Sequence, residues 1–225
     1  TAIAFDPKNT ANIYLATEDG VYFSSNYGIS WIREPWPFTN VSSIAINPEN
    51  NSMIYLGINY GNGSGKIYYS KDNGSSWLSS SLNNHIPQSI AVDPVNSSIV
   101  LASNPYFFVN QNSNGTWNYW GVIYRSSNSG ASFSEVQLKM PTLLEWFYTD
   151  YGSKIYFIPK TNIAVFASGE GLYISYDAGE TWYFIDGNAI PETFTGISLS
   201  NNNIYVSTQG EGVIYVPLKS ILPHN

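Results

Sequence analysis

The sequence predicts an all-β fold, a β-propeller of about five four-stranded antiparallel blades, and three observations lead to this prediction. Aromatic residues make up 16% of the 225 residues and charged residues only 11%, whereas charged residues are usually about 25% of a soluble domain. Aromatic side chains favour pleated strands, and the abundant Asn, Ser and Gly favour turns. The third observation is an internal repeat of about 45 residues, which supplies four strands per blade and leaves the last blade incomplete.

The first strand of each repeat is an apolar segment that stops at a turn. In three copies the strand ends with Asp or Asn followed by Pro, and two weaker copies lie further along the chain. Proline cannot continue a central strand because it lacks a backbone N–H. The five copies are Ile3 to Pro7, Ile44 to Pro48, Ile90 to Pro94, Ile155 to Pro159 and Ile197 to Asn201.

The second strand is a nearly continuous apolar run, which is typical of a strand covered on both faces. Its copies are Ile13 to Thr17, Ile54 to Ile58, Ile99 to Ser103, Ala164 to Ser168 and Ile204 to Thr208. The third strand alternates more clearly between apolar and polar residues. Its copies are Val21 to Ser24, Ile67 to Ser70, Ile123 to Ser126, Leu172 to Ser175 and Val213 to Val216.

In the first four repeats the third strand runs directly into an eight-residue motif, S-x-[DN]-x-G-x-x-[WF]. The copies read SSNYGISW, SKDNGSSW, SSNSGASF and SYDAGETW. This motif resembles the Asp-box, also called the BNR repeat, and with its preceding strands the resemblance covers nearly the whole chain. The motif positions are Ser24, Asn26, Gly28, Trp31, Ser70, Asp72, Gly74, Trp77, Ser126, Asn128, Gly130, Phe133, Ser175, Asp177, Gly179 and Trp182.

Each motif position has a structural role that follows from its chemistry. The Asp or Asn side chain can cap backbone N–H groups of its own turn, and Gly permits a positive φ. The terminal aromatic residue is expected to bury itself against a neighbouring sheet and to begin the fourth strand. We therefore interpret Asn26, Asp72, Asn128 and Asp177 as structural residues rather than as catalytic or metal-binding ones.

The repeats predict a single propeller domain over residues 1-225, with blades at about 1–38, 39–84, 85–140, 141–188 and 189–220. The fifth unit contains three strands and no motif, and its last strand ends at Pro217. Because the chain begins directly on the first strand of blade 1, we expect no spare strand upstream within it. Residues before Thr1, or a larger propeller, would then complete the fifth blade.

Two long loops between second and third strands predict a binding surface on the face opposite the motif turns. They run from Asn59 to Gly65 and from Asn104 to Gly121, and the segments after blades 1 and 3 add aromatic residues to the same face. Long loops and clustered aromatics are typical of recognition sites; a small satellite core is the alternative. The binding candidates are Trp36, Tyr60, Tyr106, Trp117, Tyr119, Trp120 and Trp146.

Composition narrows the classes of function. The formal net charge is −7 with only nine Lys and Arg residues, so the basic stripe that nucleic acids require is missing. The apolar runs are too short for a transmembrane helix, so we expect no membrane insertion. The chain has no cysteine, which excludes disulfides and thiolate metal sites. We expect no cofactor and no metal, and the oligomeric state stays open.

Asp-box propellers include sialidases, xyloglucan-cleaving endoglucanases, sortilin-type receptors and photosystem assembly factors. The three arginines of a sialidase site are not available, since the chain has only Arg33 and Arg125. A glycosidase needs two carboxylates about 5–10 Å apart. The candidates for such a pair include Asp19, Glu145, Asp150, Glu170 and Glu211.

Three acidic residues recur at the same turn, which favours a structural turn signature, or a ring of acids on one face, over a unique acid/base pair: Glu18, Glu170 and Glu211. His85 and His224 have no catalytic or zinc motif around them, so we place both in surface loops. No catalytic residue is assigned. The sequence therefore favours a non-enzymatic binding or structural propeller that recognises protein or glycan. A glycoside hydrolase related to the xyloglucanases is the alternative.

The localisation expected from the sequence is extracellular or at the cell surface. A surface poor in charge and rich in Tyr, Asn and Ser resembles that of secreted prokaryotic proteins. Six N-x-S/T sequons give possible glycosylation sites, slightly more than composition alone would produce. They begin at Asn40, Asn50, Asn62, Asn73, Asn96 and Asn114.

Overall fold

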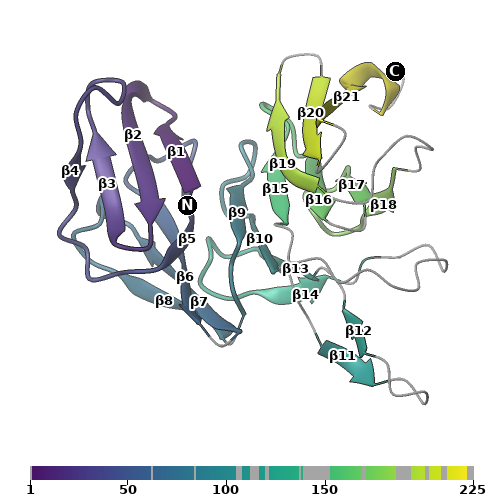
Figure 1. The fold of residues 1–225 in the computed structure, drawn as a ribbon, viewed down its shortest axis with the longest axis horizontal. Coiled ribbons are helices and arrows are strands. Elements are labelled where there is room, and N and C mark those ends of the chain that lie inside the picture. Colours follow the sequence, from purple (N-terminus) through teal and green to yellow (C-terminus); the bar gives the residue numbers. More distant parts are fainter. Residues whose placement is uncertain are drawn as a thin grey trace.

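The computed structural model describes residues 2–61, 63–83, 85–104, 108–111, 117–119, 122–136, 138, 153–168, 171–185, 194–200, 203–208 and 212–221. Five antiparallel sheets follow one another along the chain and stand as blades around a common centre (Figure 1). The predicted β-propeller is therefore confirmed. Among the described residues no helix is of a length and hydropathy that would cross a membrane.

The blades are consecutive in sequence. Blade 1 contains β1 (Ala2–Asp6), β2 (Asn9–Thr17), β3 (Gly20–Ser24) and β4 (Ile32–Arg33). Blade 2 contains β5 (Val41–Ile46), β6 (Ile54–Gly61), β7 (Ser64–Ser70) and β8 (Leu78–Asn83). Blade 3 contains β9 (Ser89–Val92), β10 (Val100–Asn104), β13 (Val122–Ser126) and β14 (Ser134–Val136). Blade 4 contains β15 (Lys154–Phe157), β16 (Ala164–Ser168), β17 (Gly171–Ser175) and β18 (Tyr183–Phe184).

Blade 5 has three described strands, β19 (Phe194–Leu199), β20 (Asn203–Thr208) and β21 (Gly212–Pro217), as the missing fourth segment predicted. A short 3-10 helix, η1 (Leu218–Ser220), follows β21 and buries Leu218 in the core that blade 5 shares with blade 4. The hydroxyl of Tyr176 also donates a hydrogen bond to the carbonyl of Ile221. The end of the described chain is thus fastened to blade 4.

The long loops predicted between second and third strands are partly paired. β6 and β7 continue their ladder out to Gly61 and Ser64. Within the second loop, β11 (Phe108–Gln111) and β12 (Trp117–Tyr119) form a separate hairpin, which projects away from the blades in Figure 1. The outer strands also begin one residue after the motif aromatic rather than at it.

The four motif segments, which we call box turns, adopt one hydrogen-bonding pattern. In blade 2, the Ser70 hydroxyl accepts from the N–H of Gly74 at 2.8 Å and donates to the Asp72 carboxylate at 2.7 Å. The same carboxylate accepts from the N–H of Ser76 at 2.8 Å. These bonds hold two successive residues at positive φ, Asn73 and Gly74. The expected capping role of the acidic position and the backbone role of glycine therefore agree with the geometry.

Each blade has two faces because strand side chains alternate, and both faces are covered in blades 2, 3 and 4. The forward face packs on the next blade in the chain and the backward face on the preceding one. Tyr55, on the forward face of blade 2, lies in the cluster that blades 2 and 3 share. Its neighbour Ile54 points backward into the cluster shared with blade 1. Four such buried clusters hold the five blades together.

The box turn of one blade contacts the second strand of the blade before it. A Cβ built on Gly130 in blade 3 would lie 2.7 Å from the Tyr55 ring of blade 2, and one on Gly179 in blade 4 would lie 2.5 Å from Leu101 of blade 3. The Tyr55 hydroxyl also donates to the carbonyl of Ser129 in the same turn at 3.3 Å. Only glycine leaves room for this approach, in addition to its positive φ.

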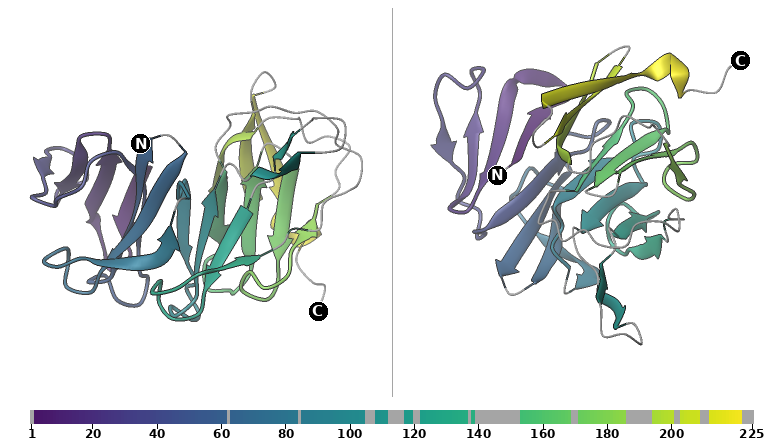
Figure 2. Two further views of the ribbon diagram at one scale, coloured as in Figure 1. Left: turned by 90° about the horizontal axis from the view of Figure 1, so that it is seen from below. Right: turned by 45° about the vertical axis from the view of Figure 1, so that its right-hand side comes forward.

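Blade 1 and blade 5 each expose one face that is covered in the other blades. Among the described residues, Ile3 on the backward face of blade 1 is 55% exposed, whereas Ile44, Ile90, Ile155 and Ile197 at the same register are at most 7% exposed. On the forward face of blade 5, Val213 is 66% exposed. Its counterparts are at most 1% exposed: Val21, Ile67, Ile123 and Leu172. Blades 1 and 5 lie at opposite ends of the molecule in the left view of Figure 2.

Two substitutions at the same register test the assignment of covered and exposed faces. Leu172→Glu would place a carboxylate between blades 4 and 5, so we expect it to lower the free energy of unfolding by about 3 kcal/mol or more. Val213→Glu, at the same register in blade 5, should change it by no more than about 0.5 kcal/mol. Urea denaturation of the two variants measures both values, and equal losses would contradict the described faces.

Candidate functional site

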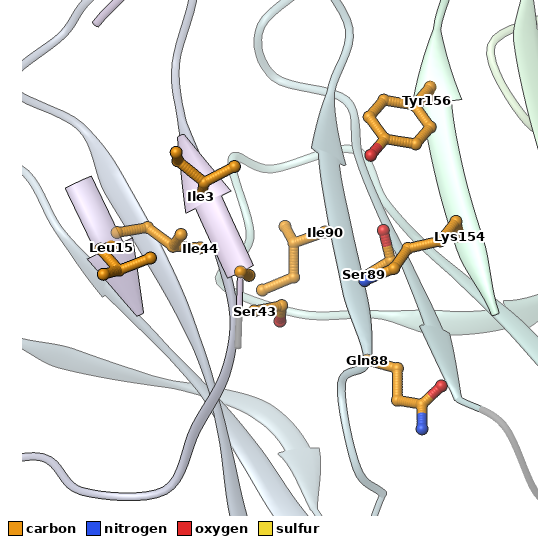
Figure 3. Close-up of a pocket in the computed structure, with 10 residues that line it drawn as sticks. Ile3, Leu15, Ser43, Ile44, Gln88, Ser89, Ile90, Lys154 and Tyr156 are labelled. Carbon is orange, nitrogen blue, oxygen red and sulfur yellow. The ribbon is translucent and has the colours of Figure 1, made fainter. Parts of the chain in front are cut away.

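A cavity of about 410 Å³ lies at the centre of the propeller, where the first strands of blades 1 to 4 converge (Figure 3). Its walls come from β1, β2, β5, β9 and β15. Ile3, Ile44 and Ile90 supply apolar wall, and Gln88, Ser89, Lys154 and Tyr156 supply polar groups. The cavity lies toward the end of the propeller opposite the box turns, because the first strands begin there.

Two lining residues of blade 4 depart from the repeat. The other blades carry only small residues at the positions that correspond to Lys154 and Tyr156. The counterparts of Lys154 are Ala2, Ser43, Ser89 and Gly196, and those of Tyr156 are Ala4, Ala45, Ala91 and Ser198. Blade 4 therefore projects two long side chains into space that the other four blades leave open.

Hydrogen bonds between blades 3 and 4 fix the strand that carries these two residues. The Ser89 hydroxyl accepts from the N–H of Ile155 at 3.2 Å. The N–H of Ser153 donates to the side-chain oxygen of Gln88 at 3.0 Å, and the Ser153 hydroxyl donates to that of Ser103 at 2.9 Å. Lys154 and Tyr156 are thus presented on a strand anchored on both sides of Lys154, at Ser153 and at Ile155.

The protein around the cavity shifts the pKa values of Lys154 and Tyr156. Burial lowers the pKa of the Lys154 ammonium and raises the pKa of the Tyr156 phenol, because each charged form loses hydration. Tyr156 is nevertheless 39% exposed, since a group in a recess can meet water while protein surrounds it. In the part of the chain that the structure describes, no carboxylate lines the cavity and none forms an ion pair with Lys154.

Figure 3 shows how the two side chains lie. Lys154 extends from β15 toward β9 and passes Ser89, while Tyr156 points across toward Ile90 from further along the same strand. Both therefore reach into the cavity from blade 4 rather than lying along its wall.

Of the predicted aromatic candidates, Tyr60 lies where the sequence placed it. It is 54% exposed near the tip of the β6–β7 hairpin, and its hydroxyl is 2.9 Å from that of Tyr68. Burial and this hydrogen bond raise the pKa of Tyr60 to about 12, so it remains a neutral donor at physiological pH. Trp117 and Tyr119 belong to β12, but their side chains, like Tyr106, Trp120 and Trp146, lie outside the described residues.

The prediction for Trp36 needs correction. Trp36 is only 7% exposed and fills the space between blades 1 and 2, with its ring 5.0 Å from that of Trp77 and 6.0 Å from that of Tyr14. It also meets Gly74 and lines a separate cavity of about 560 Å³ beside that box turn. Trp36 is therefore a core residue whose ring reaches the box-turn side, rather than part of an exposed aromatic surface opposite.

The aromatic residue of the box turn is buried only where a preceding blade covers it. Trp182 is 4% exposed, Trp77 and Phe133 are half-buried, and Trp31 of blade 1 is 37% exposed. In Trp31, Trp77 and Trp182 the indole N–H donates to the carbonyl of the turn glycine. The expected burial of this residue thus depends on the neighbouring blade.

The other predicted residues that the structure describes lie away from the cavity. The Arg125 guanidinium donates to the Ala178 carbonyl at 2.9 Å and pairs with Glu180 at 3.0 Å, on the box turn of blade 4. Asp19 is exposed and accepts from the Tyr22 hydroxyl at 2.7 Å. Glu145, Asp150, Glu170, Glu211 and His224 are not among the described residues.

The sequons lie at exposed positions wherever the structure describes them. Asn40, Asn50, Asn73 and Asn96 are all exposed, and Asn40 and Asn73 have positive φ. Asn62 and Asn114 lie outside the described residues. The four described side chains are therefore accessible to a modifying enzyme.

The repeat pattern does not single out Lys154 and Tyr156, because it reports only what the blades share. The signal was present: the first strands read Ala-Ile-Ala, Ser-Ile-Ala, Ser-Ile-Ala, Lys-Ile-Tyr and Gly-Ile-Ser. When the five segments are aligned on the central isoleucine, only blade 4 has long side chains on both sides of it. A departure from a repeat is where a propeller can carry a specific task, since the repeat itself maintains the packing.

Comparison of folds places the chain among β-propellers. No protein-family profile matches it, and no curated protein is similar to it in sequence. An ancestral GH74 enzyme superposes with a TM-score of 0.69 at 22% identity, over 92% of this chain and 27% of that one. The GH74 xyloglucanase of Xanthomonas campestris gives 0.64 at 16%, over 92% and 33%. The chain thus spans about a third or less of these enzymes.

Two further structures of the same shape contain a bound protein or peptide. A chain of the nidogen–laminin complex superposes with a TM-score of 0.65 at 13% identity, over 100% of this chain and 78% of that one. YCF48 bound to D1 peptide gives 0.56 at 13%, over 96% and 62%. At these identities the likeness establishes the fold and nothing finer.

His85 lies in the loop between β8 and β9, as predicted, but its side chain is not fully exposed, and this gives a pH test. It is half-buried, with its ring 4.8 Å from that of Tyr124. Burial lowers the pKa of His85, against a smaller opposing effect of the Glu135 carboxylate. The folded protein therefore favours the neutral ring, and its stability is complete above the unfolded pKa, about 6.5, and falls as pH drops below it.

We expect His85→Gln to flatten this dependence. The difference in melting temperature between pH 8 and pH 5.5 should be smaller in the variant than in the wild type, because the glutamine does not titrate. Scanning calorimetry at both pH values measures it. The other histidine, His224, is present in both proteins and cancels in the comparison. An unchanged difference would show that His85 does not contribute.

Proposed function

We propose that this propeller is a non-enzymatic binding module that recognises a protein or glycan at the end of the propeller opposite the box turns. The observation that carries the proposal is the central cavity with Lys154 and Tyr156, two long polar side chains at registers that are small in every other blade. The exposed Tyr60 hairpin lies at the same end and extends the polar and aromatic surface.

The similar structures support this choice by analogy. YCF48 was solved with D1 peptide and the nidogen chain in a complex with laminin, so propellers of this shape do bind polypeptides. An Asp-box relationship, rather than a chance recurrence of the motif, is part of the proposal. It rests on four box turns with the same hydrogen bonds and paired left-handed residues.

A glycoside hydrolase remains the second candidate, since GH74 enzymes superpose with TM-scores of 0.69 and 0.64. Hydrolysis requires an acid and a nucleophile or base on opposite sides of the bond. The polar groups that the described cavity presents are an ammonium, a phenol, an amide and two serine hydroxyls. These groups serve binding better than glycosidic cleavage, which is why the binding module is preferred.

We also propose that the protein acts outside the cell or at its surface. The exposure of four sequon asparagines supports this, because N-glycosylation needs an accessible side chain. Mass spectrometry of the protein from its native source, before and after glycosidase treatment, would test it. A protein recovered without glycan at Asn40, Asn50, Asn73 and Asn96 would remove this support.

Parallel screens separate the two functions. A glycan array and a peptide array report binding, and a panel of polysaccharides including xyloglucan reports turnover by release of reducing ends. We expect binding without turnover. Trp117→Ala with Trp120→Ala should weaken binding with little change in melting temperature if the long loop takes part. Turnover abolished by replacing one pair of carboxylates would establish the hydrolase, and unchanged binding with a lower melting temperature would make the loop a satellite core.

A further inference from the structure

We propose that the central cavity is a site for a carboxylate group, held by Lys154 with Tyr156 and Gln88 as additional hydrogen-bond donors. This inference rests on the proposed binding function and specifies the chemistry of its ligand. The carboxylate can come from a polypeptide or from an acidic sugar, and the chemistry shared by these two sources is what the cavity recognises.

The polar groups of the cavity are donors. The Lys154 ammonium has three N–H groups and no acceptor, and the Tyr156 phenol is neutral with its O–H to give. The side-chain oxygen of Gln88 already accepts the N–H of Ser153, which leaves its NH₂ group as the end that donates. Among the described residues these three donors have no acceptor. A ligand that fits must therefore bring acceptor oxygens.

The other hydroxyls of the wall are already used in the structure. The Ser43 hydroxyl donates to the Pro87 carbonyl at 2.6 Å, and that of Ser89 donates to the Ile155 carbonyl at 3.4 Å. These bonds join blade 2 to blade 3 and blade 3 to blade 4. The donor set that faces a ligand is thus concentrated on Lys154, Tyr156 and Gln88.

One positive charge matches a monoanion. A carboxylate carries a single charge and two oxygens, so it can take a charge-assisted bond from Lys154 and a second bond from a neutral donor. A phosphate carries up to two charges and is usually held by several cationic groups, whereas the described wall supplies only Lys154. The protein as a whole has a net charge of −7, which further disfavours polyanions.

The apolar part of the wall defines what is attached to the carboxylate. Ile3, Leu15, Ile44 and Ile90 lie across the cavity from Lys154 (Figure 3). They give an apolar or ring-shaped group a surface to contact, beside an ammonium that is itself partly buried. A charge-assisted bond gains strength in such a setting because water screens it less.

The repeat provides the argument against a purely structural lysine. The register of Lys154 holds Ala2, Ser43, Ser89 and Gly196 in the other blades, and those blades pack without a cation there. The structure gives Lys154 no described ion-pair partner that would compensate its partial loss of hydration. A cation in a cavity without a counter-charge lowers the free energy of unfolding, and a bound anionic ligand would offset this loss.

Two matched arrays test the proposal. One presents peptides with a free C-terminal carboxylate beside the same peptides as C-terminal amides. The other presents neutral oligosaccharides that carry a single uronic acid beside the methyl esters of the same oligosaccharides. We expect binding to the acid forms and at least about tenfold weaker binding to the neutral forms. The array that gives binders identifies the source of the carboxylate, and calorimetry of the best acid supplies its dissociation constant.

The role of each donor is tested with variants against that acid. Lys154→Gln keeps a polar chain of similar length but removes the charge, and we expect it to weaken binding by about ten- to a hundredfold. Tyr156→Phe removes one hydroxyl and should weaken binding less. Lys8→Gln, at an exposed turn of blade 1, also removes one positive charge and should leave binding within about twofold.

The outcomes distinguish this inference from the function on which it rests. Binders that bind equally well as amides or esters, or that bind Lys154→Gln as tightly as wild type, would overturn the carboxylate site and leave a binding module standing. No binder on either array would overturn both. Unchanged melting temperatures of the three variants show that a loss of binding comes from the site and not from unfolding. If Lys154→Gln does not fold, the affinity of Tyr156→Phe tests the site instead.

Discussion

The contact between the glycine of a box turn and a side chain that precedes its blade in the chain limits how closely blades 2, 3 and 4 can pack on the blades before them. Gly130 lies against Tyr55 and Gly179 against Leu101, and in each case a Cβ would collide with the facing side chain. Between blades 1 and 2 the indole of Trp36 takes the same place against Gly74. The motif thus has two roles: its hydrogen bonds shape the turn, and its glycine allows the preceding blade to approach.

The central cavity lies where the first strands of these packed blades meet. Ser43 and Ser89 then join neighbouring blades through hydrogen bonds at the centre. Small residues at this register keep the centre open in blades 1, 2, 3 and 5. Against that uniform background, Lys154 and Tyr156 of blade 4 give the cavity one polar side. The repeated residues form the framework of the blades, and the two residues that depart from the repeat supply polar groups to the cavity.

Much of this architecture could be predicted from the sequence because repeated local signals agree. Prolines after first strands, continuous apolar second strands and the box turns locate four blades, and the missing motif locates the shorter fifth. The positions of single side chains in space are harder to predict. Trp36 was assigned to an exposed surface because a linker residue has no periodic partner, and only the packing of Tyr14 and Trp77 places it in the core. Lys154 and Tyr156 required the register between blades, which one strand does not reveal.

The most direct measurement compares alanine substitutions at two box-turn glycines with nearly equal backbone angles, φ of 82° at Gly28 and 83° at Gly130. At Gly28 the nearest atom to a new Cβ belongs to Trp31 of the same turn, at 3.4 Å, whereas at Gly130 it is the Tyr55 ring of the preceding blade, at 2.7 Å. Gly28→Ala should therefore cost only the left-handed backbone penalty of about 1–2 kcal/mol. Gly130→Ala should cost about 1–3 kcal/mol more, because blades 2 and 3 must move apart. Equal free energies of unfolding for the two variants would contradict the account.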